Sequence, residues 1–241
     1  MRVHLQRDVE KLKRQILALS AEVENDVRMA VRAIEDRDEE LARRVMEREA
    51  QTNVMEVDVE EDCLKILALH QPVAGDLRYI ITILKINQDL ERIGDLAVHI
   101  AERGLFLCSH PPPNIPFRLG EMADKAQTML GKVLDGFVNV DAAAAREVCA
   151  ADHEIDMINR DIYQQIRKAV VQTPDAFETL LHVLHIARHL ERIADHATNI
   201  AEDLIYMIEG RIVRHTAEVS HSGHEAVTVN SAHLKSDNLL T

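Results

Sequence analysis

The chain has 241 residues, which is enough for one large domain or two ordinary ones. It carries 28 basic and 41 acidic residues, a formal net charge of −13, so its acidic surface argues against binding to nucleic acid. Aromatic residues make up only 3% and Trp is absent, while Gly and Pro number 8 and 6. This composition favours long helices.

Several classes of protein are disfavoured by what the sequence lacks. The three cysteines, Cys63, Cys108 and Cys149, are widely spaced without a CxxC pair, which is typical of a reduced intracellular protein. The first residues are charged and lack the apolar core of a secretory signal, and no uninterrupted apolar run reaches the roughly 18 residues of a membrane span. Phosphate-loop, dinucleotide-binding and nucleophile motifs are missing, so no catalytic residue is predicted.

Apolar residues at spacings of three and four predict three helices in the first half of the chain. The first covers residues 4–36 and ends at a charged corner, and the second covers 38–69 and ends before Pro72. Asp76 is predicted to cap the third, which continues to about residue 107.

A proline-rich stretch at 109–116 then interrupts the pattern, and we interpret it as a stiff linker between domains. Helical periodicity returns in three segments, at 117–138, 141–171 and 174–209. We therefore predict an all-α protein of six long antiparallel helices, arranged as two tandem three-helix bundles. The predicted division is 1–108 for the first bundle, 109–116 for the linker, 117–210 for the second bundle and 211–241 for a disordered, flexible tail.

An internal repeat supports this duplication. Residues 90–102 and 190–202 are identical at nine of thirteen positions, at an offset of 100. Each copy holds two acids four residues apart, which lie on one face of a helix and repel each other. These pairs are Glu91 with Asp95 and Glu191 with Asp195. Residues that extend the same ridge are His99, Glu102, Asn199, Glu202 and Asp203.

A second acidic pair, Asp152 and Asp156, lies on the helix predicted at 141–171. Its counterpart in the first half, at an offset of 103, is Glu49 with Asn53. If neighbouring helices are antiparallel, four oxygen donors converge in each half, and such a cluster is costly without a cation. Oxygen-rich ligands of this kind suit magnesium, manganese, calcium, iron or zinc. The alternative is that these acids form ordinary salt bridges with Arg92, Lys85 or a neighbouring helix.

The histidines allow two interpretations as well. His182, His185 and His189 have helical spacing that would suit a ligand group, but we interpret them as bundle histidines with ordinary hydrogen-bond partners. His221, His224 and His233 lie in the tail, where they could bind metal adventitiously.

At these residues the sequence resembles the PhoU family of phosphate-specific transport regulators. The acidic signature of that family is matched by the four pairs above, with Asn53 as a departure from it. Further matching stretches are Arg44-Val45-Met46, Asn53-Val54-Met55-Glu56, Gln71-Pro72-x-Ala74-x-Asp76-Leu77-Arg78 and Gly210-x-x-Val213-Arg214-His215.

The resemblance implies a cytoplasmic, non-catalytic regulator that restrains the phosphate-starvation response. It implies an adaptor, peripheral at the inner membrane, between the ATPase subunit of a phosphate ABC transporter and a sensor histidine kinase. It also implies a homodimer that binds iron, zinc, manganese or magnesium. The metal ligands would then be Glu49, Asn53, Glu91, Asp95, Asp152, Asp156, Glu191 and Asp195.

Two alternative functions remain open from the residues. A helical di-metal carboxylate oxidase is disfavoured, because such bundles use Glu-x-x-His on two helices and the chain has this pattern only at Glu218 and His221. A purely structural scaffold, whose acids only solvate the helices, is distinguished from the regulator by metal titration.

Overall fold

The structure, a computed structural model, describes residues 2–111 and 117–213. Within these ranges it contains six α-helices, one short 3-10 helix and no strand. The helices are α1 (Arg2–Glu35), α2 (Glu39–His70), α3 (Ala74–Cys108), α4 (Leu119–Asn139), α5 (Ala142–Gln172) and α6 (Phe177–Glu209), with the 3-10 turn Pro174–Ala176 before α6. The predicted all-α duplicated architecture is confirmed.

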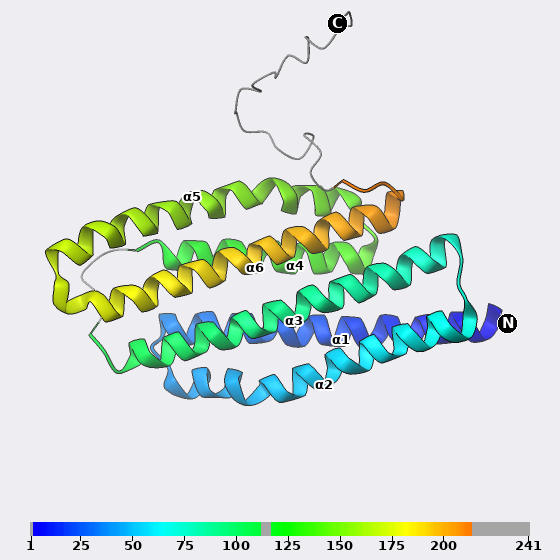
Figure 1. Cartoon of the computed structure of the whole chain (residues 1–241), viewed down its shortest axis with the longest axis horizontal. Coiled ribbons are helices and arrows are strands. Elements are labelled where there is room, and N and C mark those ends of the chain that lie inside the picture. Colours follow the sequence, from blue (N-terminus) through cyan, green and yellow to red (C-terminus); the bar gives the residue numbers. More distant parts are fainter. Residues whose placement is uncertain (1, 112–116, 214–241) are drawn as a thin grey trace, which may run out of the picture.

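The helices form two bundles that lie side by side (Figure 1). Helices α1–α3 make the first bundle and α4–α6 make the second. Helix α3 packs along α6, and α1 also contacts α4, so the buried apolar side chains of both halves form one continuous core. The apolar stripes of α3 and α6, which are copies of each other, are therefore buried against one another.

The helix starts follow local capping chemistry. The Asp38 carboxylate accepts a hydrogen bond from the backbone N–H of Leu41 at 3.0 Å and begins α2. Asp141 does the same for Ala143 and Ala144 at 2.8 and 3.2 Å and begins α5, as predicted. These two caps are 103 residues apart, which matches the offset between the acidic pairs of α2 and α5.

Asp76 does not cap α3, contrary to the sequence prediction. The helix begins at Ala74 after Val73, an extended residue without a side-chain cap, and Asp76 lies in the first turn, where an acid still favours the positive end of the helix dipole. The predicted linker lies outside the described residues at 112–116, and so does the predicted flexible tail from residue 214 onward.

The contact between α3 and α6 has a simple antiparallel register. Lys85 meets Asp203, His99 meets His189 and Phe106 meets His182, and in each facing pair the residue numbers add to 288. Because the two helices are copies offset by 100, this register makes the seam pseudo-symmetric: position n of α3 and position n + 100 of α6 have equivalent surroundings. Differences between such positions are therefore informative.

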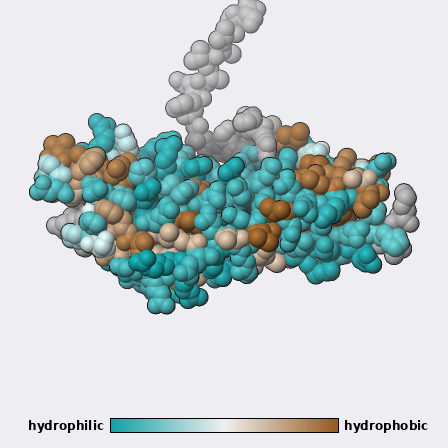
Figure 2. Space-filling model, turned by 60° about the horizontal axis from the view of Figure 1, so that its bottom comes forward, coloured by the Kyte–Doolittle hydropathy of each residue, from teal (hydrophilic) through white to brown (hydrophobic). Residues whose placement is uncertain are grey.

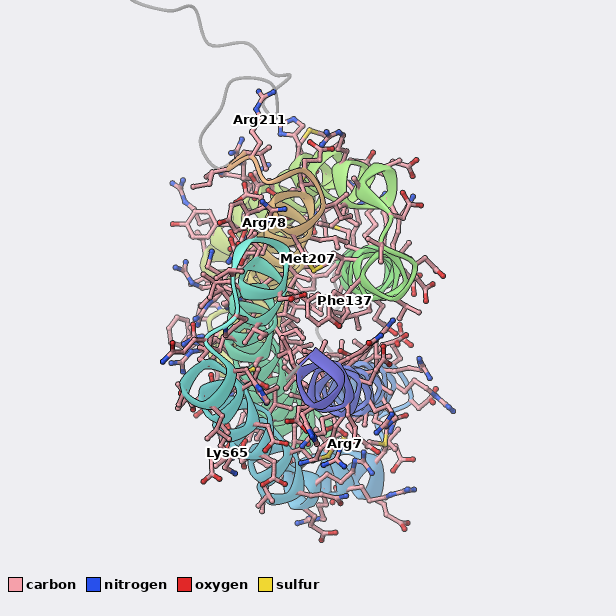
Figure 3. The ribbon with its side chains drawn as sticks, turned by 90° about the vertical axis from the view of Figure 1, so that its right-hand side faces the viewer. Arg7, Lys65, Arg78, Phe137, Met207 and Arg211 are labelled. Atoms are coloured by element: carbon pink, nitrogen blue, oxygen red, sulfur yellow. The ribbon has the colours of Figure 1, made fainter. Side chains whose placement is uncertain are left out.

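The two halves also meet at their ends. Gly210 terminates α6 in the left-handed conformation, with φ of 71°, and a Cβ built there would lie 2.9 Å from Nη1 of Arg78 on α3. Figure 3 shows Arg78 at this end of the molecule, close to the end of α6. Glycine is required here both by its φ angle and by the close approach of this guanidinium.

The surface is mainly polar. Figure 2 shows one face on which hydrophilic side chains dominate and apolar ones gather in separate patches. Within the described residues no helix is long and apolar enough to cross a membrane.

Candidate functional site

The second half concentrates four carboxylates on two adjacent helices. Asp152 and Asp156 lie on α5, and Glu191 and Asp195 lie on α6. Their mutual influence is visible in their pKa values: burial, and then the charges of Asp195 and Asp156, raise the pKa of Asp152 from 3.8 to about 6. The sequence prediction that these two pairs come together across α5 and α6 agrees with this coupling.

The other acids of this cluster are shifted in the same direction. Burial and then the charge of Asp156 raise the pKa of Glu191. Burial, and then the charges of Glu191 and Asp156, raise the pKa of Asp195. Within the described structure neither Asp152, Glu191 nor Asp195 has an ion-pair partner, and only Asp156 meets a cation, Arg160 at 3.8 Å.

These carboxylates fit a hard cation by donor chemistry, because they are several anionic oxygens whose charges raise one another's pKa values. Their side chains are not gathered tightly: among the described residues no three His, Cys, Asp or Glu side chains are positioned together to hold a metal ion. Ligation at this cluster, which we call the α5–α6 acidic cluster (Asp152, Asp156, Glu191, Asp195), would thus require rotation of side chains on fixed helices.

The first half is built differently. Glu91 and Asp95 of α3 share the guanidinium of Arg92, at 3.2 and 3.7 Å. Glu49 and Asn53 of α2 are exposed, and in the part of the chain that is described no hydrogen bond or ion pair joins either of them to α3. The salt-bridge alternative raised from the sequence therefore describes Glu91 and Asp95.

Sequence reasoning missed Glu56, an acid of α2 whose pKa is raised in part by the charge of Glu91. Its carboxylate accepts a hydrogen bond from Asn87 at 3.0 Å, and burial, Glu60 and Glu91 raise its pKa. The available signal was its position one turn beyond Asn53, within one of the stretches that resemble the PhoU family. Nearby, the buried carboxylate of Asp26 binds Arg48 at 2.7 Å and accepts from the Thr52 hydroxyl at 3.3 Å, so this junction is neutralised within the protein.

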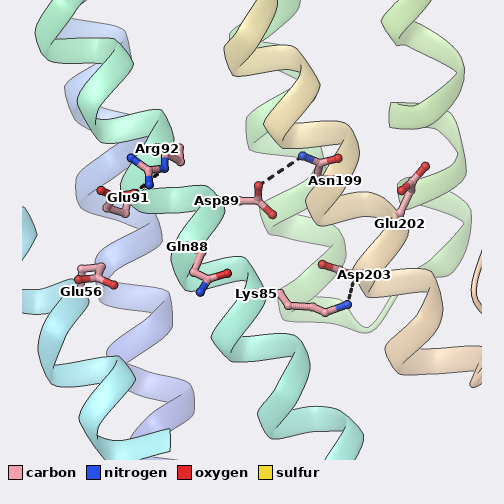
Figure 4. Close-up of a pocket in the computed structure, with 9 residues that line it drawn as sticks. All are labelled: Glu56, Lys85, Gln88, Asp89, Glu91, Arg92, Asn199, Glu202 and Asp203. Atoms are coloured by element: carbon pink, nitrogen blue, oxygen red, sulfur yellow. Dashed lines mark hydrogen bonds and ion pairs between the residues drawn. The ribbon is translucent and has the colours of Figure 1, made fainter. Parts of the chain in front are cut away.

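A polar pocket of about 830 Å³ opens beside the first-half acids, at the seam of the two bundles (Figure 4). Across it Asp89 of α3 meets His196 at 2.8 Å and Asn199 at 3.4 Å, and Lys85 meets Asp203 at 3.0 Å. Its lining residues are Glu56, Lys85, Gln88, Asp89, Glu91, Arg92, Asn199, Glu202 and Asp203. Acids outnumber bases here, so the pocket favours cationic or hydrogen-bonding groups.

The ridge predicted beyond each acidic pair is not continuous. Asp203 is 1% exposed and lies in the seam, paired with Lys85, and Asn199 donates to Asp89 there as well. His99 stacks on His189 at 5.4 Å, also within the seam. These residues face the other bundle because successive turns of a helix drift around its axis, so i+4 steps leave the first ridge after two turns.

The seam histidines do not have the ordinary hydrogen-bond partners that we expected. His182 stacks on Phe106 at 3.7 Å, but Nδ1 of His182 and Nδ1 of His189 are buried without a partner in the described structure. Burial raises the pKa of Cys63 to about 12 and that of Cys149 to about 11, so both thiols stay neutral and pack. The tail histidines lie outside the described residues.

The fold and its paired acids define a class, the tandem three-helix-bundle proteins with an acidic Glu/Asp-x-x-x-Asp helix in each half. A family model described as the PhoU domain matches this chain twice, at residues 6–104 and 119–204. The chain belongs to the PhoU family.

Relatives are similar along most of the chain. A Pseudomonas aeruginosa protein described as a phosphate-specific transport system accessory protein PhoU homolog is 38% identical over 209 residues, 86% of each chain. The crystal structure of PhoU from Pseudomonas aeruginosa matches with a TM-score of 0.83 at 37% identity, over 86% of this chain and 99% of that one. The phosphate transport system regulatory protein PhoU from Streptococcus pneumoniae matches with a TM-score of 0.80 at 28% identity, over 87% and 99%.

Proposed function

We propose that this protein is a cytoplasmic accessory regulator of phosphate uptake that restrains the phosphate-starvation response. Its PhoU membership over both halves carries this proposal, together with relatives that are described as accessory or regulatory proteins of phosphate transport. It acts as an adaptor, as a homodimer, between the ATPase subunit of a phosphate ABC transporter and a sensor histidine kinase, and it catalyses no reaction itself.

The adaptor role is tested by recovering partners from cells. Tagged protein isolated from detergent-solubilised membranes is expected to carry the transporter ATPase subunit and the sensor kinase, and deletion of its gene is expected to leave phosphatase expression high in abundant phosphate. Recovery of neither partner, with expression that still follows phosphate in the deletion strain, would refute the proposal. Light scattering after size-exclusion chromatography tests the homodimer.

The α5–α6 acidic cluster is the proposed metal site. A bound iron, zinc, manganese or magnesium ion would neutralise carboxylates that now raise one another's pKa values. Asp152 and Asp156 would hold it from α5, and Glu191 and Asp195 from α6, so that binding would tie these helices together. In the first half, Glu49, Asn53, Glu91 and Asp95 form a weaker proposed site, because the single charge of Arg92 already offsets part of the charge of two of them.

Titration of metal-stripped protein with manganese, iron or zinc tests this part separately from the adaptor role. The double variant Glu191→Gln, Asp195→Asn is expected to lose tight binding, and the matched first-half variant Glu91→Gln, Asp95→Asn is expected to retain it. Equal affinity in wild type and both variants would show that the acids only solvate the helices. Absence of oxygen consumption by iron-loaded protein is expected, and steady consumption would favour the oxidase instead.

A further inference from the structure

The seam between α3 and α6 differs in charge at its two equivalent ends. At one end the pair is Lys85 and Asp203, which neutralise each other at 3.0 Å. The pseudo-symmetric positions at the other end are His185 and Arg103, so the place of the buried carboxylate is taken by a guanidinium. The register that adds to 288 puts Arg103 opposite His185.

Arg103 has no hydrogen-bond acceptor for a buried atom of its guanidinium. The residue as a whole is half-buried, its Nε is fully buried without an acceptor, and among the described residues it forms no ion pair. A cationic donor removed from water without an acceptor costs stability, and proteins normally pair such groups. A guanidinium in this state is suited to bind an anion from solution.

The neighbours of Arg103 are also donors or cations. His182 and His189 lie one on each side of it along α6, each with a buried Nδ1 that has no partner. After burial, the pKa of His182 is lowered by Arg103, His185 and His110 and raised by one acid, Glu178. After burial, the groups that lower the pKa of His189 most are His99, His185, Arg103 and Arg192. Because burial first, and then these neighbouring charges, lower the pKa of His189 to about 4, its imidazole is neutral near pH 7, and the positive charge at this end comes from the arginines.

We propose that Arg103, with His182, forms a binding site for a small tetrahedral oxyanion such as phosphate or sulfate at the α3–α6 seam. The guanidinium offers charge-assisted hydrogen bonds to the anion, and the His182 imidazole supplies a further polar atom. The anion takes the role that the Asp203 carboxylate has at the equivalent end. This site is separate from the acidic cluster and does not depend on the proposed regulation.

Histidine-selective NMR with inorganic phosphate as the probe tests the site. The full chain, freed of metal with EDTA in phosphate-free buffer, is titrated at constant ionic strength, and sulfate is used in a parallel titration. We expect saturable shifts of the His182 ring signals and no shift of His70, which is paired with Asp8 at 3.0 Å at the far end of α2. Unequal affinity for the two anions would identify which one the site prefers.

Arg103→Met is expected to weaken anion binding by about tenfold or more, as the loss of one charge-assisted hydrogen bond requires. Arg43→Met is the matched control, because Arg43 is exposed and meets only Glu39 of its own helix at 3.4 Å. Thermal unfolding gives a second measurement: phosphate should raise the Tm of wild type and of Arg43→Met, but not that of Arg103→Met. Shifts that do not saturate, or the same response in both variants, would overturn the proposal.

Discussion

Lys85 of α3 donates a hydrogen bond to Oδ1 of Asp203 of α6 at 3.0 Å, and this ion pair joins the two bundles. The carboxyl group is almost completely buried, whereas the lysine side chain is 38% exposed at the edge of the seam pocket. If the ion pair is broken, the Lys85 ammonium can be hydrated by water, but the Asp203 carboxylate remains buried in the core.

Lys85→Met is therefore expected to destabilise the protein by about 2–4 kcal/mol, because it removes the lysine cation from a buried carboxylate. Urea unfolding followed by circular dichroism measures the change. Lys65→Met is the matched control, since Lys65 is exposed on α2 beside Glu61 of the same helix and should cost less than about 0.5 kcal/mol. Equal effects of the two substitutions would show that the seam pair contributes no more than a surface pair.

The Asp152 carboxyl makes stability depend on pH. Its folded-state pKa of about 6 lies above its ordinary value of 3.8, so the folded state holds the proton more tightly than the unfolded state. For metal-free protein, this group's contribution to the unfolding free energy falls as pH rises from about 4 to about 6, and stays low above that range. The shift corresponds to an upper limit of about 3 kcal/mol.

Asp152→Asn should remove that dependence. In EDTA, the variant is expected to gain stability relative to wild type as pH rises through this window, by about 1–3 kcal/mol at pH 7. Denaturant unfolding at pH 4, 5, 6 and 7 measures the difference between wild type and variant, which includes the response of the coupled carboxyls Asp156, Glu191 and Asp195. A difference that stays constant over this range would contradict the raised pKa.

The two halves should also respond differently when a cation is removed. Arg92→Gln in the first half frees Glu91 and Asp95 from the guanidinium that lies 3.2 and 3.7 Å away. If bound cations neutralise such acids, manganese affinity of the first half should rise severalfold, because metal no longer competes with arginine. Calorimetry on the Glu191→Gln, Asp195→Asn background isolates that half, and Arg44→Gln, an exposed change on α2, is the control. If the affinity for manganese does not rise, the first-half acids do not bind metal.

The sequence was sufficient for the architecture because helical architecture is encoded locally. Apolar periodicity predicted the helices, and the repeat at an offset of 100 predicted their duplication. The cap proposed at Asp76 failed because a Ser, Thr, Asn or Asp near a helix start also occupies the first turn favourably, and periodicity cannot separate the two positions.

The sites were harder to predict because they depend on which faces of different helices meet. The coupling of Asp152 with Asp195 followed from antiparallel packing of α5 and α6. Three features did not follow, because they depend on side-chain direction or on how helices pack: the contact of Arg92 with Asp95, the position of Glu56 and the burial of Asp203. Sequence spacing gives the acids of one helix, but not the cations that reach them.

Val140 ends α4 in the left-handed region, with φ of 57° and ψ of 45°, where a β-branched side chain is strained. Its backbone N–H binds the carbonyl of Gly136, and its side chain is 55% exposed, so it contributes little packing. Val140→Gly is therefore expected to stabilise the protein by about 1 kcal/mol, because glycine adopts this conformation without the steric cost. Differential scanning calorimetry would record this as a rise in Tm.

Val138→Gly is the matched control for that change. Val138 is similarly exposed, at 43%, but it lies inside α4, where glycine costs helix stability. The same substitution two residues apart should therefore have opposite signs: a gain at the residue that ends the helix and a loss within it. A loss at both positions would mean that the unfolded-state entropy of glycine outweighs the relief of strain at Val140, and the left-handed cap would then not be a strained element of this fold.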